Sequence, residues 1–180
     1  ANSGEILGIA GISGCGQKEL LEAIAGLQVT ESGTIDYIKD DGTRETLIGK
    51  DPLAIADMGV ALSFVPEDRL GMGLVGNMDL IDNVMLRSFR QGKTPFINRK
   101  PSKKLAAEIV ENLEVATPGI STPVRRLSGG NVQKVLVGRE ISSAPTVLLT
   151  AYAVRGLDIN SSYMIYQLLN EQKKKGVSVI

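Results

Sequence analysis

The sequence has 180 residues, 43% of them hydrophobic, and its 20 basic and 20 acidic residues cancel. One globular domain with a substantial core is expected at this length, and the charge balance gives no positive case for nucleic acid or an anionic membrane surface as a partner. The 180 residues include no histidine and one cysteine, Cys15. They therefore exclude His-ligated metal sites, histidine acid–base catalysis and an internal disulfide, and they fit a reducing cytosolic setting.

No apolar run approaches the roughly 20 residues that a membrane helix needs, and no signal peptide opens the sequence. The sequence starts shortly before one strand-like apolar run and stops inside another, residues 176–180. Because a natural terminus rarely falls within a core strand, we expect a domain cut from a longer protein.

The first predicted element is a short buried strand over residues 6–10, bounded by a glycine-rich loop over residues 11–16. Apolar residues at helical spacing then predict an amphipathic helix over residues 18–27. A strand, a glycine loop and a helix therefore open the chain.

A β-hairpin is predicted next, because Asp41-Gly42 tolerates the positive φ that a tight turn needs. Its two strands lie within residues 33–38 and 44–48. Residues 60–66 follow as a second core strand.

The second half of the chain is predicted to be mostly helical over residues 81–113, with a polar interruption around residues 91–102. A helix over residues 131–141, an apolar strand over residues 146–150 and a last helix over residues 161–174 follow. Strands that alternate with helices predict a largely parallel α/β sheet.

The glycine loop has the Gly-x-x-x-x-Gly spacing of a P-loop, in which successive backbone N–H groups and a helix N-terminus bind phosphate. The next two positions depart from that pattern. Gln17 replaces the lysine, and Lys18 replaces the hydroxyl residue that would bind Mg²⁺. Lys18 cannot take over, because one residue along a helix rotates a side chain by about 100°. Losing one charge-assisted hydrogen bond costs roughly 1.5–3 kcal/mol, or one to two decades of affinity. The loop alone is equally compatible with a tight bend that binds nothing.

A second segment, Leu-Ser-Gly-Gly-Asn-Val-Gln-Lys over residues 127–134, favours phosphate binding. Ser128 is expected to cap the helix that starts near Asn131, and Gly129 and Gly130 let backbone N–H groups approach a ligand closely. An ordinary serine-capped helix would have the same four residues. The order of glycine loop, capped helix and apolar strand makes that alternative the weaker one.

These segments together resemble the ATP-binding cassette (ABC) family. Residues 127–134 look like its signature motif, residues 147–150 like its Walker B strand and residues 156–158 like its D-loop. Residues 66–69 and 73–75 look like the Q-loop region of the second cassette of bacterial simple-sugar and nucleoside importers, and residues 14–20 lean toward the nucleoside branch.

The resemblance implies the fold: an α/β, P-loop NTPase-like cassette with a mostly parallel core sheet, a small antiparallel β part and a helical subdomain. The expected division is a single truncated nucleotide-binding domain over residues 1–180. Its core would comprise residues 1–67 and 143–180, and its helical subdomain residues 68–142 or thereabouts.

The resemblance also implies a division of labour between two cassettes that face each other head to tail. Each ATP lies between the P-loop of one cassette and the signature of the other, and in these importers the second cassette is commonly degenerate. This chain has Ala151 at the Walker B aspartate, Tyr152 at the glutamate base and Glu67 at the Q-loop glutamine. Tyrosine is a poor base at neutral pH. We therefore predict no catalytic residue and absent or very weak ATP hydrolysis by this domain alone.

The expected ligands are ATP, bound weakly in the chain's own P-loop, and the partner cassette's ATP at the signature, with Mg²⁺ only at the partner site and no metal ligand in this chain. The predicted partners are a second cassette on the same polypeptide, transmembrane permease subunits and, indirectly, an extracytoplasmic solute-binding protein, with no nucleic acid. The predicted location is the cytoplasmic face of the membrane. The candidate nucleotide-binding residues are Gly11, Ser13, Gly14, Cys15, Gly16, Gln17, Lys18, Glu19, Glu67, Ser128, Gly129, Gly130, Asn131 and Asp158.

Three alternatives stay open at this point. A structural dimerisation module would make no nucleotide contact, a soluble ABC ATPase acting on DNA or ribosomes would need a basic face, and a P-loop kinase would need the missing lysine. For Asp68 and Arg69, transmission of nucleotide state to a membrane subunit and a plain surface ion pair are weighed equally.

Overall fold

The computed structural model describes residues 1–12, 14–89 and 97–180. Its centre is a parallel sheet of three strands, in the order β3 (Leu62–Val65), β4 (Val147–Thr150) and β5 (Ser178–Val179). Leu62 lies opposite Val147, and Val147 lies opposite Ser178. Apolar, β-branched runs suit such strands because a parallel sheet is covered on both faces. The predicted parallel sheet is confirmed.

The strand predicted over residues 6–10 is wrong beyond its start. Only Ile6 pairs, as a single parallel bridge to Val179, and the Leu7 amide donates to the Val179 carbonyl at 2.8 Å. A strand needs a neighbour to bond with along its length, and among the described residues only Val179 pairs with this segment. Ile9 is 42% exposed and belongs to no strand.

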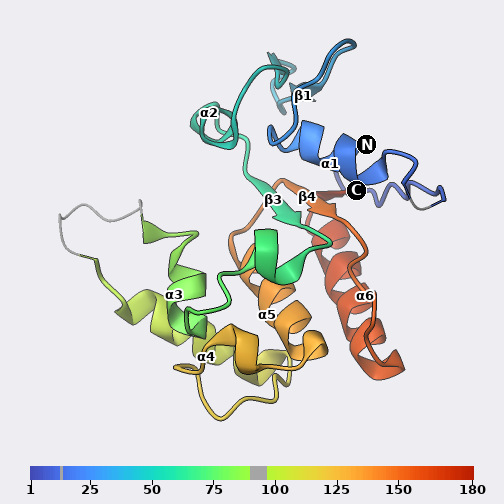
Figure 1. Cartoon of the computed structure of the whole chain (residues 1–180). Helices are drawn as coiled ribbons and strands as arrows, with labels where there is room; N and C mark the ends of the chain where they lie inside the picture. Colours follow the sequence, from blue (N-terminus) through green and yellow to red (C-terminus); the bar gives the residue numbers. More distant parts are fainter. Residues whose placement is uncertain (13, 90–96) are drawn as a thin grey trace.

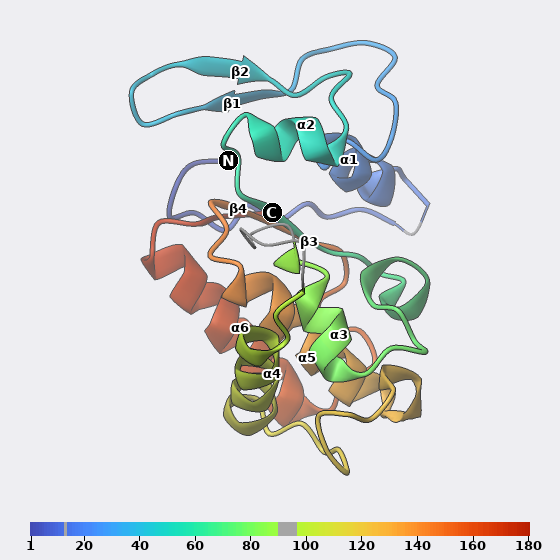
Figure 2. The same cartoon turned by 90° about the vertical axis from the view of Figure 1, so that its left-hand side faces the viewer.

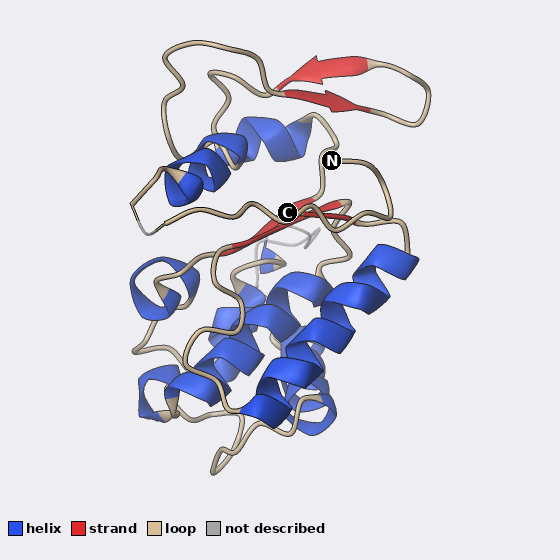
Figure 3. Ribbon diagram, turned by 90° about the vertical axis from the view of Figure 1, so that its right-hand side faces the viewer, coloured by secondary structure: helices blue, strands red, loops and turns tan. Residues whose placement is uncertain are grey.

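Helices cover both faces of the sheet, which gives three layers (Figures 1, 2 and 3). The helices on one face form a thick layer that carries most of the core: α3 (Leu80–Met85), α4 (Lys100–Asn112), α5 (Gly129–Ser142) and α6 (Ile159–Lys174). The elements on the other face are smaller: α1 (Gln17–Ile24), α2 (Pro52–Asp57) and the hairpin β1 (Asp36–Ile38) with β2 (Arg44–Thr46).

Alternation along β4 explains how both faces are filled, because successive side chains of a strand point to opposite sides. Leu148 belongs to the large cluster that includes Leu136 of α5 and Ile165 of α6. Leu149 belongs to a smaller cluster with Leu21 of α1. Four of these residues have no exposed surface and Leu21 is 6% exposed, so the sheet is buried on both sides.

The hairpin forms where the sequence predicts it, with Asp36 opposite Thr46. Gly42 has a φ of 82° and its amide donates to the Lys39 carbonyl at 2.9 Å, which closes the turn. The strands are shorter than the predicted ranges.

Between the hairpin and α3, two helical segments form that were absent from the sequence prediction. Helix α2 starts at Pro52, and the Asp51 carboxylate accepts from the Ala54 amide at 2.8 Å, which is an aspartate cap followed by proline in the first turn. The turn η1 (Arg69–Gly73) follows Asp68, whose carboxylate accepts from the Gly71 amide at 2.8 Å.

The remaining helix ends differ from prediction by a few residues. Helix α1 stops at Ile24, because Gly26 adopts a φ of 74°. Helix α4 begins at Lys100, inside the predicted interruption over residues 91–102, since proline in a first turn loses no hydrogen bond. The part of that interruption from residue 91 to 96 lies outside the described residues. A short 3₁₀ turn, η3 (Val124–Arg126), precedes α5.

A buried ion pair joins α5 to the segments beside it. The Arg139 guanidinium bonds to Glu140 Oε1 at 2.7 Å and donates to the Gly73 carbonyl at 2.7 Å. Arg87, which is partly exposed, lies 3.3 Å from Glu140 Oε2. Burial lowers the pKa of Arg139 from its ordinary value, and the Glu140 carboxylate opposes that shift.

Within the described ranges, 1–12, 14–89 and 97–180, no helix is both long and apolar enough to pass through a membrane.

Candidate functional site

The glycine loop leads into the start of α1. Gly16 is the N-cap with a φ of 94°, and no side chain caps the helix. The Gln17 side chain turns back over the loop and donates to the Ile12 carbonyl at 3.4 Å. A Cβ built on Gly11 would lie 2.0 Å from Gln17 Nε2, so any larger residue at position 11 would make the end of the Gln17 side chain move. Ser13 lies outside the described residues, and Gly14 and Cys15 are exposed.

The first turn of α1 carries little net positive charge. Lys18 Nζ lies 3.6 Å from Glu22 Oε1, one turn along the same helix, and the Lys18 side chain is 53% exposed. Glu19 is an exposed acid in the same turn. Both carboxylates reduce the attraction of this turn for phosphate.

The carboxyl end of β4 offers no carboxylate. Ala151 is buried against the α1 cluster, and Tyr152 is 47% exposed with a φ of 54°. Mg²⁺ prefers oxygen ligands, usually carboxylates. Across the described part of the chain, no group of three or more cysteine, aspartate or glutamate side chains is arranged to hold a metal ion. The residues at this strand end do not fit Mg-ATP.

The start of α5 is the serine-capped helix N-terminus that the sequence predicts. The Ser128 hydroxyl accepts from the Asn131 amide at 3.4 Å, which confirms the predicted cap, and the helix starts at Gly129, two residues earlier than expected. Ser128 and Gly129 are exposed, and Gly130 is half-buried. The Asn131 side chain donates to Ser128 Oγ at 2.9 Å and accepts from the Ala116 amide at 2.9 Å. A 14-residue helix therefore presents its positive end to solvent.

Asp158 caps the last helix. Its carboxylate accepts from the Ser161 amide at 2.9 Å and from the Ser161 hydroxyl at 2.7 Å. These two bonds, the backbone one first, hold the pKa of Asp158 below its ordinary value. The structure thus gives this predicted nucleotide ligand a structural role at the start of α6.

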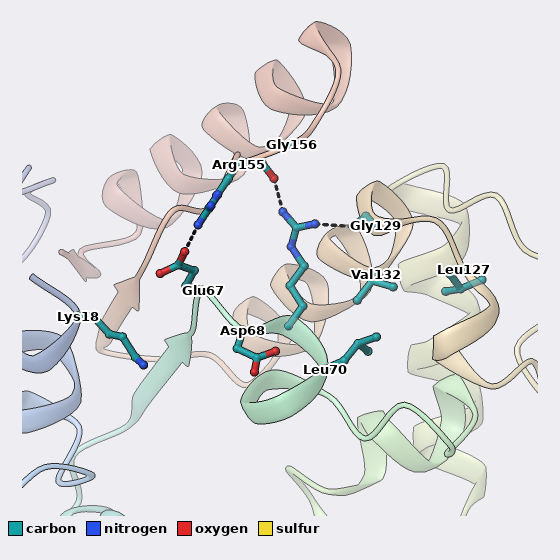
Figure 4. A pocket seen from close by; sticks show the side chains of 10 residues that line it. Lys18, Glu67, Asp68, Leu70, Leu127, Gly129, Val132, Arg155 and Gly156 are labelled. Carbon is teal, nitrogen blue, oxygen red and sulfur yellow. Dashed lines mark hydrogen bonds and ion pairs between the residues drawn. The ribbon is translucent and has the colours of Figure 1, made fainter. Parts of the chain in front are cut away.

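A cleft of about 720 Å³ brings three of the predicted site residues together. Lys18 lies on one side of it, Glu67 at the end of β3, and Gly129 at the start of α5 (Figure 4). Glu67 accepts a charged hydrogen bond from Arg155, whose guanidinium lies 5.8 Å from the centre of the Tyr152 ring. Cys15 and Asp158 do not line this cleft.

Asp68 and Arg69 do not form the ion pair that the sequence left open. Asp68 caps η1, and the Arg69 guanidinium donates to the Gly129 carbonyl at 3.1 Å and to the Arg155 carbonyl. Arg69 therefore contacts two segments that are 60 and 86 residues away in sequence.

Two residues of this region escaped the sequence reasoning. Arg155 lies just before the D-loop-like residues 156–158, and no motif in the sequence points to its contacts. Gln133, which is 1% exposed, donates to the Ala153 carbonyl at 2.7 Å, and its Oε1 atom has no hydrogen-bond partner among the described residues. An amide at a position that faces the core is the signal that would have found Gln133.

The parallel sheet, the glycine loop and the serine-capped helix together have the fold of an ABC nucleotide-binding cassette, as predicted. A family profile described as "ABC transporter" matches residues 1–150, and the chain belongs to this family.

Individual relatives agree with that assignment. The chain is 37% identical over 188 residues to a guanosine import ATP-binding protein, NupO, of Bacillus subtilis, and the match covers 99% of this chain and 34% of NupO. It is 35% identical over 179 residues to a ribose import ATP-binding protein, RbsA, of Halalkalibacterium halodurans, and covers 34% of it. The chain thus spans about a third of the length of these relatives.

Solved structures share the fold at low sequence identity. The dimeric, post-hydrolysis structure of the ATP-binding cassette MJ0796 bound to ADP and Pi superimposes with a TM-score of 0.79 at 22% identity, covering 98% of this chain and 73% of that one. A nucleotide-free cassette from an ABC transporter gives a TM-score of 0.73 at 20% identity, covering 99% of this chain and 70% of that one.

Proposed function

We propose that this chain is the accessory nucleotide-binding cassette of an ATP-driven bacterial importer for simple sugars or nucleosides. In this role it supplies an intact signature motif to a composite ATP site, whereas its own P-loop and Walker B positions do not support hydrolysis. The names of its relatives, which are import ATP-binding proteins for guanosine and ribose, support the substrate class.

One observation carries the proposal: the residues that resemble the signature motif match the family pattern, whereas those at the P-loop and Walker B positions depart from it. The exposed, serine-capped start of α5 retains a hydroxyl, two glycines and a helix N-terminus for a phosphate. The end of β4 has Ala151 and Tyr152, and the glycine loop is followed by Gln17. This difference supports a role in which the chain contacts a second cassette's nucleotide and does not itself carry out metal-assisted cleavage.

The proposed assembly follows from this role. The second cassette, on the same polypeptide, holds ATP and Mg²⁺ in its P-loop, and Ser128, Gly129 and Gly130 contact the terminal phosphate from the opposite side. Permease subunits bind the cassette pair at the cytoplasmic face of the membrane, and a solute-binding protein acts indirectly. Within this chain we assign residues 1–67 and 143–180 to the core and the residues between them to the helical subdomain.

The first test replaces Ser128 by arginine in the assembled transporter and measures ATP turnover. A bulky cation at the N-cap removes the hydroxyl and fills the space for phosphate, so turnover should fall by at least tenfold, the effect of losing one charge-assisted contact. Ser32→Arg places the same side chain at an exposed position away from α5 and should leave turnover unchanged. Unimpaired turnover in the Ser128 variant would refute the role of the signature.

The second test measures Mg-ATP binding to this chain by calorimetry. With Gln17 in place of a charged side chain, the affinity should be one to two decades weaker than in a variant that carries Gln17→Lys and Lys18→Ser. Low-micromolar affinity in the unmodified chain would contradict the proposed division of labour.

A further inference from the structure

Arg69 joins two segments that the proposed function places opposite the second cassette. Its guanidinium donates to the carbonyl of Gly129, in the first turn of the signature helix, and to the carbonyl of Arg155, in the loop between β4 and α6. The contact at Gly129 is close: a Cβ built there would lie 3.2 Å from Arg69 Nη1. The guanidinium therefore rests directly against the start of α5.

The Arg155 side chain ties the same loop back to the end of β3. Its guanidinium donates to the Glu67 carboxylate, and the two side chains point toward each other across the cleft (Figure 4). Residues 67 and 69 are thus bonded to Arg155 in two ways, one through its side chain and one through its main chain. This reciprocal arrangement fixes the position of the loop relative to β3.

Beneath the exposed contacts of Arg69 and Arg155, other contacts hold α5 in the core. Gln133 is buried and donates to the Ala153 carbonyl at 2.7 Å, and Leu136, one turn further, is fully buried in the main core. Removing Arg69 would leave these contacts in place. The fold should therefore survive the loss of Arg69, while the first turn of α5 and the tip of the loop lose their direct connection.

We propose that Arg69 is a positioning residue, which holds the start of the signature helix and the loop around Arg155 in the fixed relative position that the composite ATP site needs. This inference rests on the proposed function. The proposed role differs from a simple surface ion pair between Arg69 and Asp68. In this role Arg69 touches no nucleotide and acts by holding Gly129 and Arg155 in place.

The chemistry of arginine suits this role. A guanidinium is planar and has five N–H donors in fixed directions, so it can bond two carbonyls that belong to different segments at once. A lysine ammonium is a single centre at the end of a flexible stem and would keep one of the two contacts. A glutamine side chain is uncharged, so it would keep neither charge-assisted hydrogen bond.

The test uses the assembled transporter and compares Arg69→Gln, Arg69→Lys and the control Arg44→Gln. Arg44 lies on the hairpin, where its side chain is 69% exposed and pairs with Asp36. We expect Arg69→Gln to lower kcat for ATP about tenfold and to change KM by less than about twofold. The lost interaction acts when the signature closes on ATP already held by the second cassette. Arg69→Lys should retain at least about three times the kcat of Arg69→Gln, and Arg44→Gln should match the unmodified protein.

Thermal melting of the same three variants separates positioning from folding. A melting temperature within about 3 °C of the unmodified protein is expected for Arg69→Gln, since its guanidinium makes few buried contacts. The inference is overturned by an unchanged kcat, by a larger fall in melting temperature, or by equal loss in the lysine and glutamine variants. If Ser128→Arg also leaves turnover intact, the proposed function itself fails; if only Arg69→Gln does, the positioning role alone fails.

Discussion

Replacing Arg139 by methionine removes one half of the buried ion pair in α5 and keeps the aliphatic volume. The side chains of Arg139 and Glu140 are 8% and 2% exposed, so neither charge is solvated by water. The substitution deletes the bonds to Glu140 Oε1 and to the Gly73 carbonyl. It leaves a buried carboxylate with Arg87 as its remaining partner, at 3.3 Å.

The expected cost follows from those partners. Breaking a buried ion pair by removing one member typically costs 3–5 kcal/mol, and an unsatisfied carbonyl adds about 1 kcal/mol or more. Arg87 keeps one oxygen of Glu140 paired, which places the total at about 3–5 kcal/mol. For a chain of this length, a melting temperature lower by roughly 10 °C is expected.

Urea and thermal unfolding of Arg139→Met, Glu140→Met and the double variant measure this cost. The double variant removes the stranded carboxylate as well, and Arg87 can turn its partly exposed side chain to solvent. It should therefore be more stable than Arg139→Met by about 1–3 kcal/mol. A double variant that is as unstable as the single one would show that the stability comes from packing, and the electrostatic reasoning would be wrong.

Three further predictions test other features of the structure. Tyr152→Glu should raise phosphate release by less than about twofold, because a base alone does not restore the missing metal ligands. Asp158→Asn should flatten the pH dependence of stability. The folded pKa of Asp158 is depressed, so its carboxylate stabilises the fold above about pH 4, and this stabilisation is lost as the pH falls through the folded pKa. Melting curves between about pH 2 and 5 would detect the difference. Gly138→Val should lower the free energy of unfolding in urea by about 1–3 kcal/mol, because a Cβ there would lie 2.9 Å from Ile109 Cγ2. Its control, Gly119→Val, has open space around it and should lower that free energy by less than about 0.5 kcal/mol.

Local signals in the sequence account for much of the fold. Asp41-Gly42 predicted the hairpin turn, and Ser128 predicted the cap of α5, because both act within a few residues of themselves. The same kind of signal, Asp51 before Pro52, marks the start of α2.

Residues 6–10 show where local reasoning fails. Their apolar composition predicts a strand, but a strand also needs a neighbour to pair with, and among the described residues this segment forms only the bridge from Ile6 to Val179. Composition carries no information about which neighbour a segment pairs with.

In the candidate site, too, local features could be predicted from the sequence and long-range contacts could not. The glycine loop and the start of α5 were found by spacing, whereas the contacts of Arg69 join positions 60 and 86 residues apart. No periodicity or motif spacing reports on such contacts, since they depend on how η1 is placed against α5. For the same reason the sequence alone did not distinguish an Asp68–Arg69 ion pair from the observed capping and bridging.

The Oε1 atom of Gln133 has no hydrogen-bond partner in the part of the chain that the structure describes, and this affects how the region opens. An amide buried with one unsatisfied acceptor lowers the free energy needed to expose it, while its bond to Ala153 links α5 to the loop after β4. Any fluctuation that admits water to this amide must part both segments together. Backbone amides next to Gln133 and Ala153 should therefore exchange with deuterium at one shared rate, faster than the amide of Leu148 in the centre of the sheet.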